Sequence, residues 1–405
     1  MDEIPNHSIA RYYSRYLRCG AGNPQGECMK LNRKLIGWSA LLLIMSSSSW
    51  AGALAGESFA DYIARTQSDL KEHKVWLDNS QWQRELAAVS PFELMPNEQL
   101  CAGRPRIGVL LSHGLSDSPF SMRDSAQALQ AACYQVRVID GHGTRAEDLL
   151  DVSREQWRES FYNAAEQFST QLDALYVGGF STGGALATDY AWNHSESVKG
   201  VILFAPAFKI NSSIDWLSPW LAPFIDWLDQ YPDDDFAKYA SIPVPAIAQV
   251  YKLAKEVRTQ VLGQPSSLPV FIALSEEDQT VDSKVTQQVF NNGMIGQNSQ
   301  MLLYSVSQMN ANTDRVKVYN SDWSDKRILG LSHMGVLGNP NNDYYGEQGS
   351  YRVCSWHMAD EDLYQACRNQ EDHWFGERSE ALLAKSPHAA RVSWNPHFDA
   401  LMQEA

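Results

Sequence analysis

The stretch from Leu175 to Gly184 constrains the fold of this chain more than any other. An apolar run of strand type ends in glycines, a serine stands between two glycine pairs, and a helix-like segment follows. Residues 179–183 read Gly-Phe-Ser-Thr-Gly and fit the pattern G-x-S-x-G, a sharp strand-to-helix turn that exposes a serine hydroxyl above a sheet. Gly179 and Gly183 lack a Cβ, so neighbouring elements can approach them closely. Ordinary glycine-rich turns also match this pattern, so its meaning depends on the rest of the chain.

Strand-like and helix-like segments alternate on both sides of this stretch. Ser118-Pro119 and the capping box that begins at Ser153 mark helix starts, the first predicting a helix through Leu129. Alternation of this kind predicts an α/β protein with a mostly parallel sheet covered by helices on both faces. The remaining expected strands are 107–111, 136–139, 201–204, 270–274 and 316–319.

An insertion at about 207–265 interrupts the alternation. It carries Trp216, Trp220, Phe224 and Trp227 at helical spacing, followed by a second amphipathic helix. Ligands of open α/β sheets bind outside the carboxyl ends of the strands. Because the insertion follows such a strand end, we expect a helical cap over the site. The alternative is that these helices only pack against the core.

Three side chains at predicted strand ends form a nucleophile, an acid and a base in chain order. Ser181 lies in the glycine turn, Asp278 follows the strand 270–274, and His333 follows the last expected strand. This order suits acyl transfer, in which His333 Nε2 takes the serine proton and Asp278 orients the imidazole. Glu276, Glu277 and Asp282 are the competing acids, and Asp278 is preferred on spacing.

Backbone N–H groups complete the predicted machinery. Thr182 begins the helix after the turn, and Leu115 lies in the loop after the first core strand, so their N–H groups are the expected oxyanion donors. His113 and His142 are expected to be structural. No Cys/His cluster, H-E-x-x-H motif or Walker-type glycine loop is present in the sequence, so neither a metal, a cofactor nor phosphoryl transfer is predicted.

These motifs together resemble α/β-hydrolases of the monoacylglycerol lipase and carboxylesterase type. The resemblance covers roughly residues 100–337 and implies the α/β-hydrolase fold and cofactor-free hydrolysis of carboxylic esters through an acyl-enzyme. The tail after His333 and the stretch 283–315 depart from the family. The matching motifs are His113-Gly114-Leu115, Gly141-His142-Gly143-Thr144, Gly179–Gly183, Asp278-x-x-Val281 and His333.

Residues 1–55 read as a targeting segment. Three basic residues at 30–34, an apolar run at 35–45, a serine tract and a small-residue stretch follow the order of a secretory signal, with Met29 as the expected true start. We therefore expect an exported protein, periplasmic or secreted. An uncleaved N-terminal membrane anchor is the alternative.

The remaining chain divides into a helical leader (56–100), the core (101–337) and a C-terminal extension (338–405). Four cysteines lie in the expected mature chain, an even number that suggests disulfides in an exported protein. Of the three pairings, we favour Cys101–Cys133 and Cys354–Cys367, which join the cysteines nearest in sequence.

The chain is acidic, with a net charge of −15, so no nucleic-acid partner is expected. The predicted substrate is a small ester or lipid with an apolar acyl chain, and the aromatic cap is suited to transient membrane or lipid contact. The sequence carries no indication of oligomeric state. Alternatives are a serine peptidase or acyltransferase with the same triad, or a non-catalytic binding protein of the cell envelope.

Overall fold

The computed structural model describes residues 52–141, 145–307, 313–369 and 373–405, all within one unit that spans 47–405. Most of the expected targeting segment, residues 1–51, lies outside these ranges. Within the described ranges, no helix is long and apolar enough to cross a membrane.

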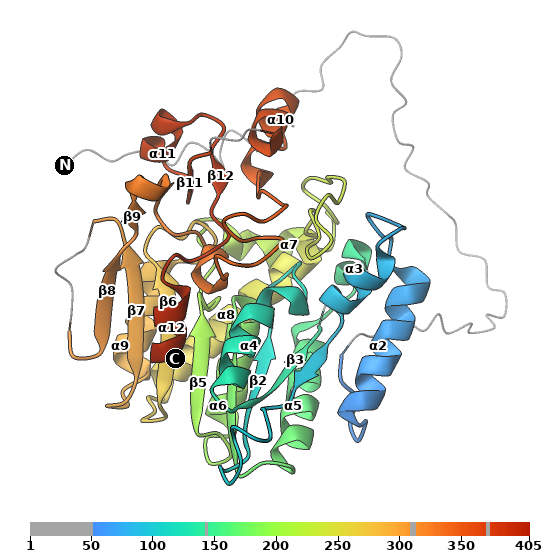
Figure 1. Cartoon of the computed structure of the whole chain (residues 1–405), viewed down its shortest axis with the longest axis vertical. Coiled ribbons are helices and arrows are strands. Elements are labelled where there is room, and N and C mark those ends of the chain that lie inside the picture. Colours follow the sequence, from blue (N-terminus) through green and yellow to red (C-terminus); the bar gives the residue numbers. More distant parts are fainter. Residues whose placement is uncertain (1–51, 142–144, 308–312, 370–372) are drawn as a thin grey trace. The chain divides into compact units, whose positions relative to one another are not determined.

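The main sheet follows the order β1-β3-β2-β4-β5-β6-β7-β8 (Figure 1). Every neighbouring pair from β3 to β8 is parallel, and only the edge strand β1 runs antiparallel. The predicted α/β class and mostly parallel sheet are therefore confirmed. The strands are β1 (Phe92–Leu94), β2 (Ile107–Ser112), β3 (Gln135–Ile139), β4 (Ala174–Phe180), β5 (Gly200–Phe204), β6 (Val270–Ser275), β7 (Gln300–Ser305) and β8 (Val316–Asn320).

Two of these strands were not predicted. β1 is three residues long and lies between Pro91 and Pro96, where its pairing with β3 decides its conformation. β7 lies in the stretch 283–315, which departs from the family pattern in the sequence. The same stretch also contains α9 (Ser283–Gly293). A short apolar run without alternation does not distinguish strand from helix, so β7 carries no clear signal of its own.

Helices cover both faces of the sheet (Figure 1). On one face, α5 (Arg154–Ser169), α6 (Thr182–Asn193), α8 (Val244–Gly263) and α9 contact one another in succession. On the other face, α4 (Arg123–Ala131) contacts α12 (Phe398–Glu404).

Of the two predicted helix caps, one is correct. The Ser153 side chain accepts from the Gln156 N–H, and the Gln156 side chain bonds back to the Ser153 N–H, as the capping box requires. The Ser118 side chain makes no capping bond. The predicted start itself is correct, because Ser118 is the N-cap residue of a 3₁₀ turn, η1 (Pro119–Met122), and α4 continues from it.

The leader forms α2 (Phe59–His73), α3 (Trp82–Val89) and the strand β1. Phe59 and Tyr62 are buried in the main core, and the Tyr62 hydroxyl donates to the Asp140 carbonyl at 2.9 Å. The leader therefore contacts the core, and one of its segments extends the sheet.

The insertion at 207–265 divides into two parts. Its first part contains the short helices η3 (Asp215–Leu217) and α7 (Ser218–Leu221), which expose large apolar side chains. Its second part is α8, whose Ala246, Leu253 and Val257 are buried in the main core. Packing against the core, the alternative to a cap, therefore accounts for one face of α8.

The C-terminal extension folds onto the core and contributes two of the four strands of a second, smaller sheet. Its order is β12-β11-β10-β9, formed by β9 (Asp322–Trp323), β10 (Ile328–Leu329), β11 (Phe375–Gly376) and β12 (Ala390–Arg391). Two short helices, α10 (Glu361–Asn369) and α11 (Glu380–Lys385), lie in the same region (Figure 1). The structure contains both expected disulfides, Cys101–Cys133 and Cys354–Cys367.

Candidate active site

The glycine turn places Ser181 between a strand and a helix. β4 ends at Phe180 and α6 begins at Thr182, while Ser181 itself has φ 55° and ψ −115°. A positive φ is uncommon for a residue with a Cβ and costs free energy that the surrounding structure must offset. A Cβ on Gly183 would lie 2.1 Å from the Ser112 carbonyl oxygen, so only glycine fits there. The turn therefore has the form that the sequence pattern predicts.

Asp278 and His333 lie together although the chain separates them widely. His333 Nδ1 is 2.6 Å from Asp278 Oδ2, and both side chains are buried. The other carboxylate oxygen of Asp278 accepts from the backbone N–H groups of Thr280 at 2.7 Å and Val281 at 2.9 Å. These bonds fix the carboxylate, and the carboxylate in turn fixes the imidazole.

The route of the chain to His333 differs in one respect from the prediction. β8 is the last strand of the main sheet, but β9 and β10 of the smaller sheet lie between β8 and His333. The imidazole packs against the ring of Phe180, with centroids 4.7 Å apart. The base is thus held beside the serine turn by a strand that the sequence did not predict.

The competing acids are engaged elsewhere. Glu276 bonds the Ser305 hydroxyl, and Glu277 accepts from the Val306 N–H at 2.8 Å. Burial raises the pKa of Glu277. Asp282 caps α9 by accepting from the Val285 N–H. Asp278 is therefore the acid that the structure brings to the imidazole.

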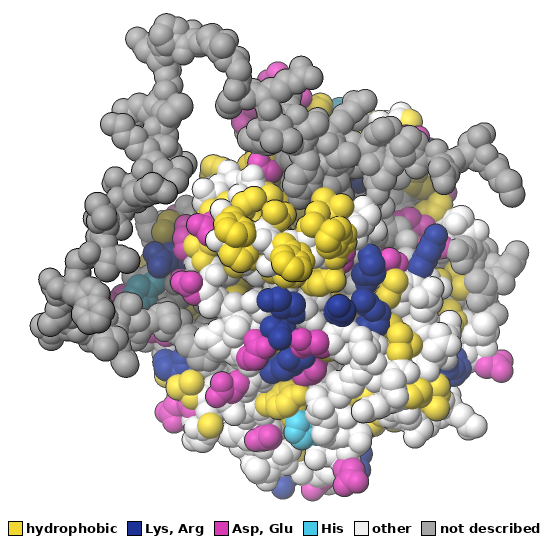
Figure 2. All heavy atoms as spheres, turned by 180° about the vertical axis from the view of Figure 1, so that it is seen from behind, with side chains coloured by type: hydrophobic (Ala, Val, Ile, Leu, Met, Phe, Trp, Pro, Cys, Tyr) yellow, Lys and Arg dark blue, Asp and Glu magenta, His cyan; other side chains and the backbone are white. Residues whose placement is uncertain are grey.

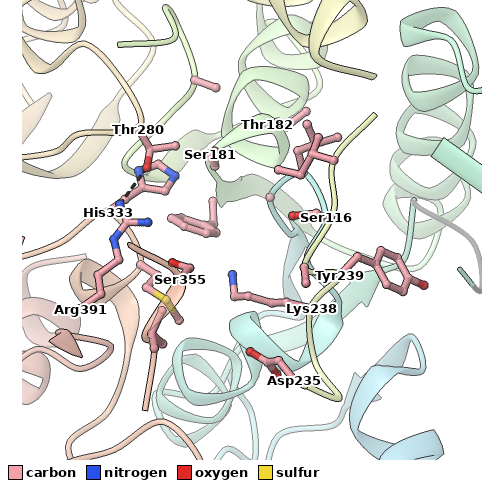
Figure 3. A pocket seen from close by; sticks show the side chains of 18 of the residues that line it. Ser116, Ser181, Thr182, Asp235, Lys238, Tyr239, Thr280, His333, Ser355 and Arg391 are labelled. Atoms are coloured by element: carbon pink, nitrogen blue, oxygen red, sulfur yellow. Dashed lines mark hydrogen bonds between the residues drawn. The ribbon is translucent and has the colours of Figure 1, made fainter. Parts of the chain in front are cut away.

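The residues that carry the two expected oxyanion donors line the same cavity as Ser181. Leu115, Ser181 and Thr182 line one cavity, and Thr182 is the first residue of α6 (Figure 3). The first N–H groups of a helix have no partner within the helix and carry partial positive charge. The His113 ring is buried between the Gly114 carbonyl and the Asp140 carboxylate. Residues 142–144, which include His142, lie outside the described residues.

The cavity has a volume of about 420 Å³, and Ser181 and His333 both line it (Figure 3). Most of the remaining lining is apolar, and the insertion, which includes α8, supplies the largest share of it. Lys238 Nζ lies 3.3 Å from Asp117 Oδ2, so this ammonium in the wall is paired. The apolar lining includes Ala207, Ile210, Ala240, Ile242, Ile247, Val250, Val281 and Met334.

The C-terminal extension supplies a wall of this cavity that sequence reasoning missed. Its lining residues are Tyr351, Val353, Ser355, Met358 and Arg391. None of them belongs to a motif, and only the nearby cysteine pair distinguished this region in the sequence. The disulfide Cys354–Cys367 closes the segment that contains Ser355 and Met358, and Val353 directly precedes it.

Tyrosines of the extension hold the insertion in place. Tyr344 Oη and Tyr345 Oη both donate to the Asp235 carboxylate, the former at 3.1 Å. Tyr351 and Tyr364 donate in the same way to Asp234. Burial raises the pKa of Asp235 to about 6, while the tyrosine bonds lower it. The two segments that enclose the cavity are therefore joined by buried polar contacts.

Comparison with known proteins agrees with this geometry. Residues 103–231 match the family model described as serine aminopeptidase, S33. A thermostable monoacylglycerol lipase from Bacillus sp. (strain H-257) is 27% identical over 182 residues, which are 43% of this chain and 72% of that protein.

Solved structures with a similar arrangement include lipolytic enzymes. A metagenome-derived enzyme described with LipS and LipT has 24% sequence identity and a TM-score of 0.47, covering 53% of this chain and 87% of its own. A soluble variant of monoglyceride lipase from Saccharomyces cerevisiae has 15% identity and a TM-score of 0.45, covering 53% and 82%.

The parallel sheet and the serine turn give this chain the α/β-hydrolase fold. In sequence, part of the chain is similar to the serine aminopeptidase family model and to a monoacylglycerol lipase.

Proposed function

We propose that the protein is a serine hydrolase that cleaves carboxylic esters with Ser181, His333 and Asp278. The observation that carries the proposal is the 2.6 Å contact between His333 Nδ1 and Asp278 Oδ2 beside a cavity that Ser181 also lines. A base that is oriented by a buried acid and lies next to a strained serine is the arrangement that activates a hydroxyl for acyl transfer.

The reaction then proceeds in two halves. Ser181 Oγ attacks the ester carbonyl while His333 Nε2 takes its proton, and the N–H groups of Leu115 and Thr182 stabilise the oxyanion. Collapse of the tetrahedral intermediate breaks the ester C–O bond, and the imidazolium gives its proton to the departing alcohol. Water, deprotonated by His333, then attacks the acyl-enzyme and releases the acid. Asp278 stabilises the imidazolium in both halves.

The cavity lining supports an apolar acyl group. Isoleucine, valine and methionine side chains from α8, the insertion and the extension surround the space in front of Ser181. Burial of apolar acyl surface against them stabilises the complex by roughly 25 cal/mol per Å². We therefore propose a small ester or a lipid as the substrate, in keeping with the lipase to which the chain is similar.

Peptide hydrolysis is the second candidate, because the family model that matches residues 103–231 is described as a serine aminopeptidase. The same triad also supports acyl transfer to another alcohol. A panel of p-nitrophenyl esters of increasing chain length, compared with aminoacyl p-nitroanilides, separates these activities. Faster turnover of the anilides would favour the peptidase.

A fluorophosphonate probe tests the central proposal. The purified protein should be labelled, and peptide mapping should place the label on Ser181, whereas Ser181→Ala should remain unlabelled. Turnover of Ser181→Ala should fall by about 10⁶ if the three residues act as a unit. Absence of labelling, or labelling at another residue, would support the non-catalytic alternative instead.

We further propose that the protein is exported, on the basis of the two disulfides and the signal-like residues 1–55. Trp216, Trp220 and Phe224 expose 52%, 73% and 86% of their surface in the insertion. Figure 2 shows a broad hydrophobic patch on the corresponding face, which suits transient contact with lipid. Cell fractionation tests export directly, and a protein found in the cytoplasm would contradict it.

A further inference from the structure

Glu377 of the C-terminal extension touches both loops of the proposed triad. Its side chain is 1% exposed. Oε2 accepts from the backbone N–H of Gln279 at 3.4 Å and from the backbone N–H of His333 at 3.3 Å. Gln279 directly follows Asp278. One carboxylate oxygen thus bridges the loop that contains Asp278 (the acid loop) and the loop that contains His333 (the base loop).

A half-buried arginine extends this bridge. Arg391 Nη2 donates to Glu377 Oε2 at 2.7 Å and to the Thr280 hydroxyl at 2.8 Å. The Thr280 N–H in turn donates to Asp278 Oδ1. Figure 3 shows the Arg391 side chain extending toward Thr280 beside His333. The bonds therefore form a continuous path from the extension to the carboxylate that orients the base.

The smaller sheet explains why these groups reach the site. Glu377 directly follows β11, which pairs in parallel with β10, the strand that leads to His333. Arg391 belongs to β12, which pairs with β11 on its other side. A Cβ on Gly376 would lie 2.0 Å from the Leu329 carbonyl oxygen, so β11 approaches β10 as closely as glycine allows. The extension is built to bring Glu377 against the base loop.

Stability alone is a poor explanation for this arrangement. In the pair Glu377–Arg391 the side chains are 1% and 17% exposed. An ion pair that is largely withdrawn from water loses hydration that its attraction offsets only in part, and apolar side chains of similar size are often equally stable. Fixed geometry is the better-supported use of such a pair. Displacement of a catalytic group by about 1 Å can lower turnover about 100-fold.

We propose that Glu377 is a positioning residue that holds the acid loop and the base loop in register. The inference rests on the proposed function, since it assigns Glu377 a role through Asp278 and His333. Glu377 itself is not among the residues that line the cavity around Ser181. It acts through the backbone of its neighbours, and its partner Arg391 forms part of the cavity wall.

The test compares Glu377→Ala and Glu377→Gln with wild type and with Glu404→Gln. Glu404 is a matched control, because it also belongs to the extension and pairs with a cation, Lys317, at the edge of the main sheet. For each protein, kcat and KM are measured on a p-nitrophenyl ester. The rate constant of fluorophosphonate labelling at Ser181 is measured in parallel. Both kcat and this rate constant are then expressed per labelled site, with the fraction of sites labelled at saturation as the divisor.

Glu377→Ala should lower kcat and the labelling rate constant together by about 10- to 100-fold, with little change in KM. Glu377→Gln retains the size and an acceptor oxygen, so its decrease should be smaller but measurable. Glu404→Gln should behave as wild type. If Glu377→Ala does not fold, Glu377→Gln decides the question.

The measurements distinguish failure of this inference from failure of the proposed function. If wild type is labelled at Ser181 and the Glu377 variants turn over at the wild-type rate per labelled site, this inference is wrong and the proposed function stands. If wild type is not labelled at Ser181, the proposed function itself fails. A loss of folded protein with unchanged rates per labelled site would give Glu377 a structural role only.

Discussion

His333 Nδ1 lies 2.6 Å from Asp278 Oδ2, across a separation of 55 positions in the chain. Two different segments therefore had to be brought together, one by β6 of the main sheet and one by β10 of the smaller sheet. The contact leaves Nε2, the other ring nitrogen, as the atom to take a proton from Ser181 in the proposed mechanism.

Replacement of Asp278 by asparagine should disable the proposed base. An amide presents no charge to stabilise the imidazolium and favours the wrong tautomer, so kcat should fall by about 10⁴ with the fold retained. Steady-state kinetics on an ester substrate measures this. Asp282→Asn is the control, because asparagine caps a helix as well as aspartate does and should leave kcat unchanged. Equal effects of the two substitutions would contradict the assignment of Asp278 as the acid that orients His333.

Asp235 should make the stability of the protein depend on pH. Burial raises its pKa to about 6, against about 3.9 in an unfolded chain. Between these two pKa values the folded state binds more protons than the unfolded state. The contribution of Asp235 to the free energy of unfolding therefore falls as the pH rises, by about 3 kcal/mol in total.

Asp235→Asn cannot ionise and still accepts hydrogen bonds from Tyr344 and Tyr345. Its free energy of unfolding should therefore decrease less than that of wild type between pH 4 and pH 6. Urea unfolding of both proteins across this range checks the prediction. Parallel stability curves would show that Asp235 does not titrate there.

The two disulfides should differ in their effect on activity. On the loop-entropy relation, removal of the pair Cys354–Cys367 should cost about 3 kcal/mol and removal of Cys101–Cys133 about 4 kcal/mol. Val353, Ser355 and Met358 flank the former and line the cavity, so its double serine variant should also turn over long-chain esters poorly. The double serine variant of Cys101–Cys133 should retain wild-type kcat per labelled site. The reverse pattern would argue against a cavity wall built by the extension.

Gly183→Ala should disrupt the serine turn. The added methyl would meet the backbone oxygens of Ser112 at 2.1 Å and His113 at 2.6 Å, and relief of that overlap would displace the loop that carries Leu115. We expect a loss of about 3 kcal/mol in stability and most of the activity. Gly263→Ala, in open space at the end of α8, should be neutral or slightly stabilising. Thermal unfolding and ester hydrolysis compare the two.

The sequence predicted the parts of the molecule that local chemistry determines. The strand–turn–helix around Ser181 follows from glycines whose neighbours leave no room for a Cβ, and the cap at Ser153 follows from a local hydrogen-bond pattern. Asp278 was predicted from its place after an apolar run, since parallel strands end at the same edge of a sheet. These features are recognisable because each is encoded within a few residues.

The parts that escaped prediction depend on distant partners. β1 is a strand because it pairs with β3. The two-residue strands β10, β11 and β12 form because they pair with one another. Glu377 and Arg391 resemble any charged residues in the sequence, and their position beside Thr280 and His333 follows from that pairing. No local pattern could have indicated them.

The wall that Tyr351, Val353, Met358 and Arg391 contribute to the cavity has a consequence for synthesis of the protein. A ribosome delivers a chain from its N-terminus, and a domain folds as a unit once its segments are available. Ser181 and its turn therefore emerge well before the residues that enclose the space in front of them. The cavity can be completed only after the segment up to Arg391 has been released.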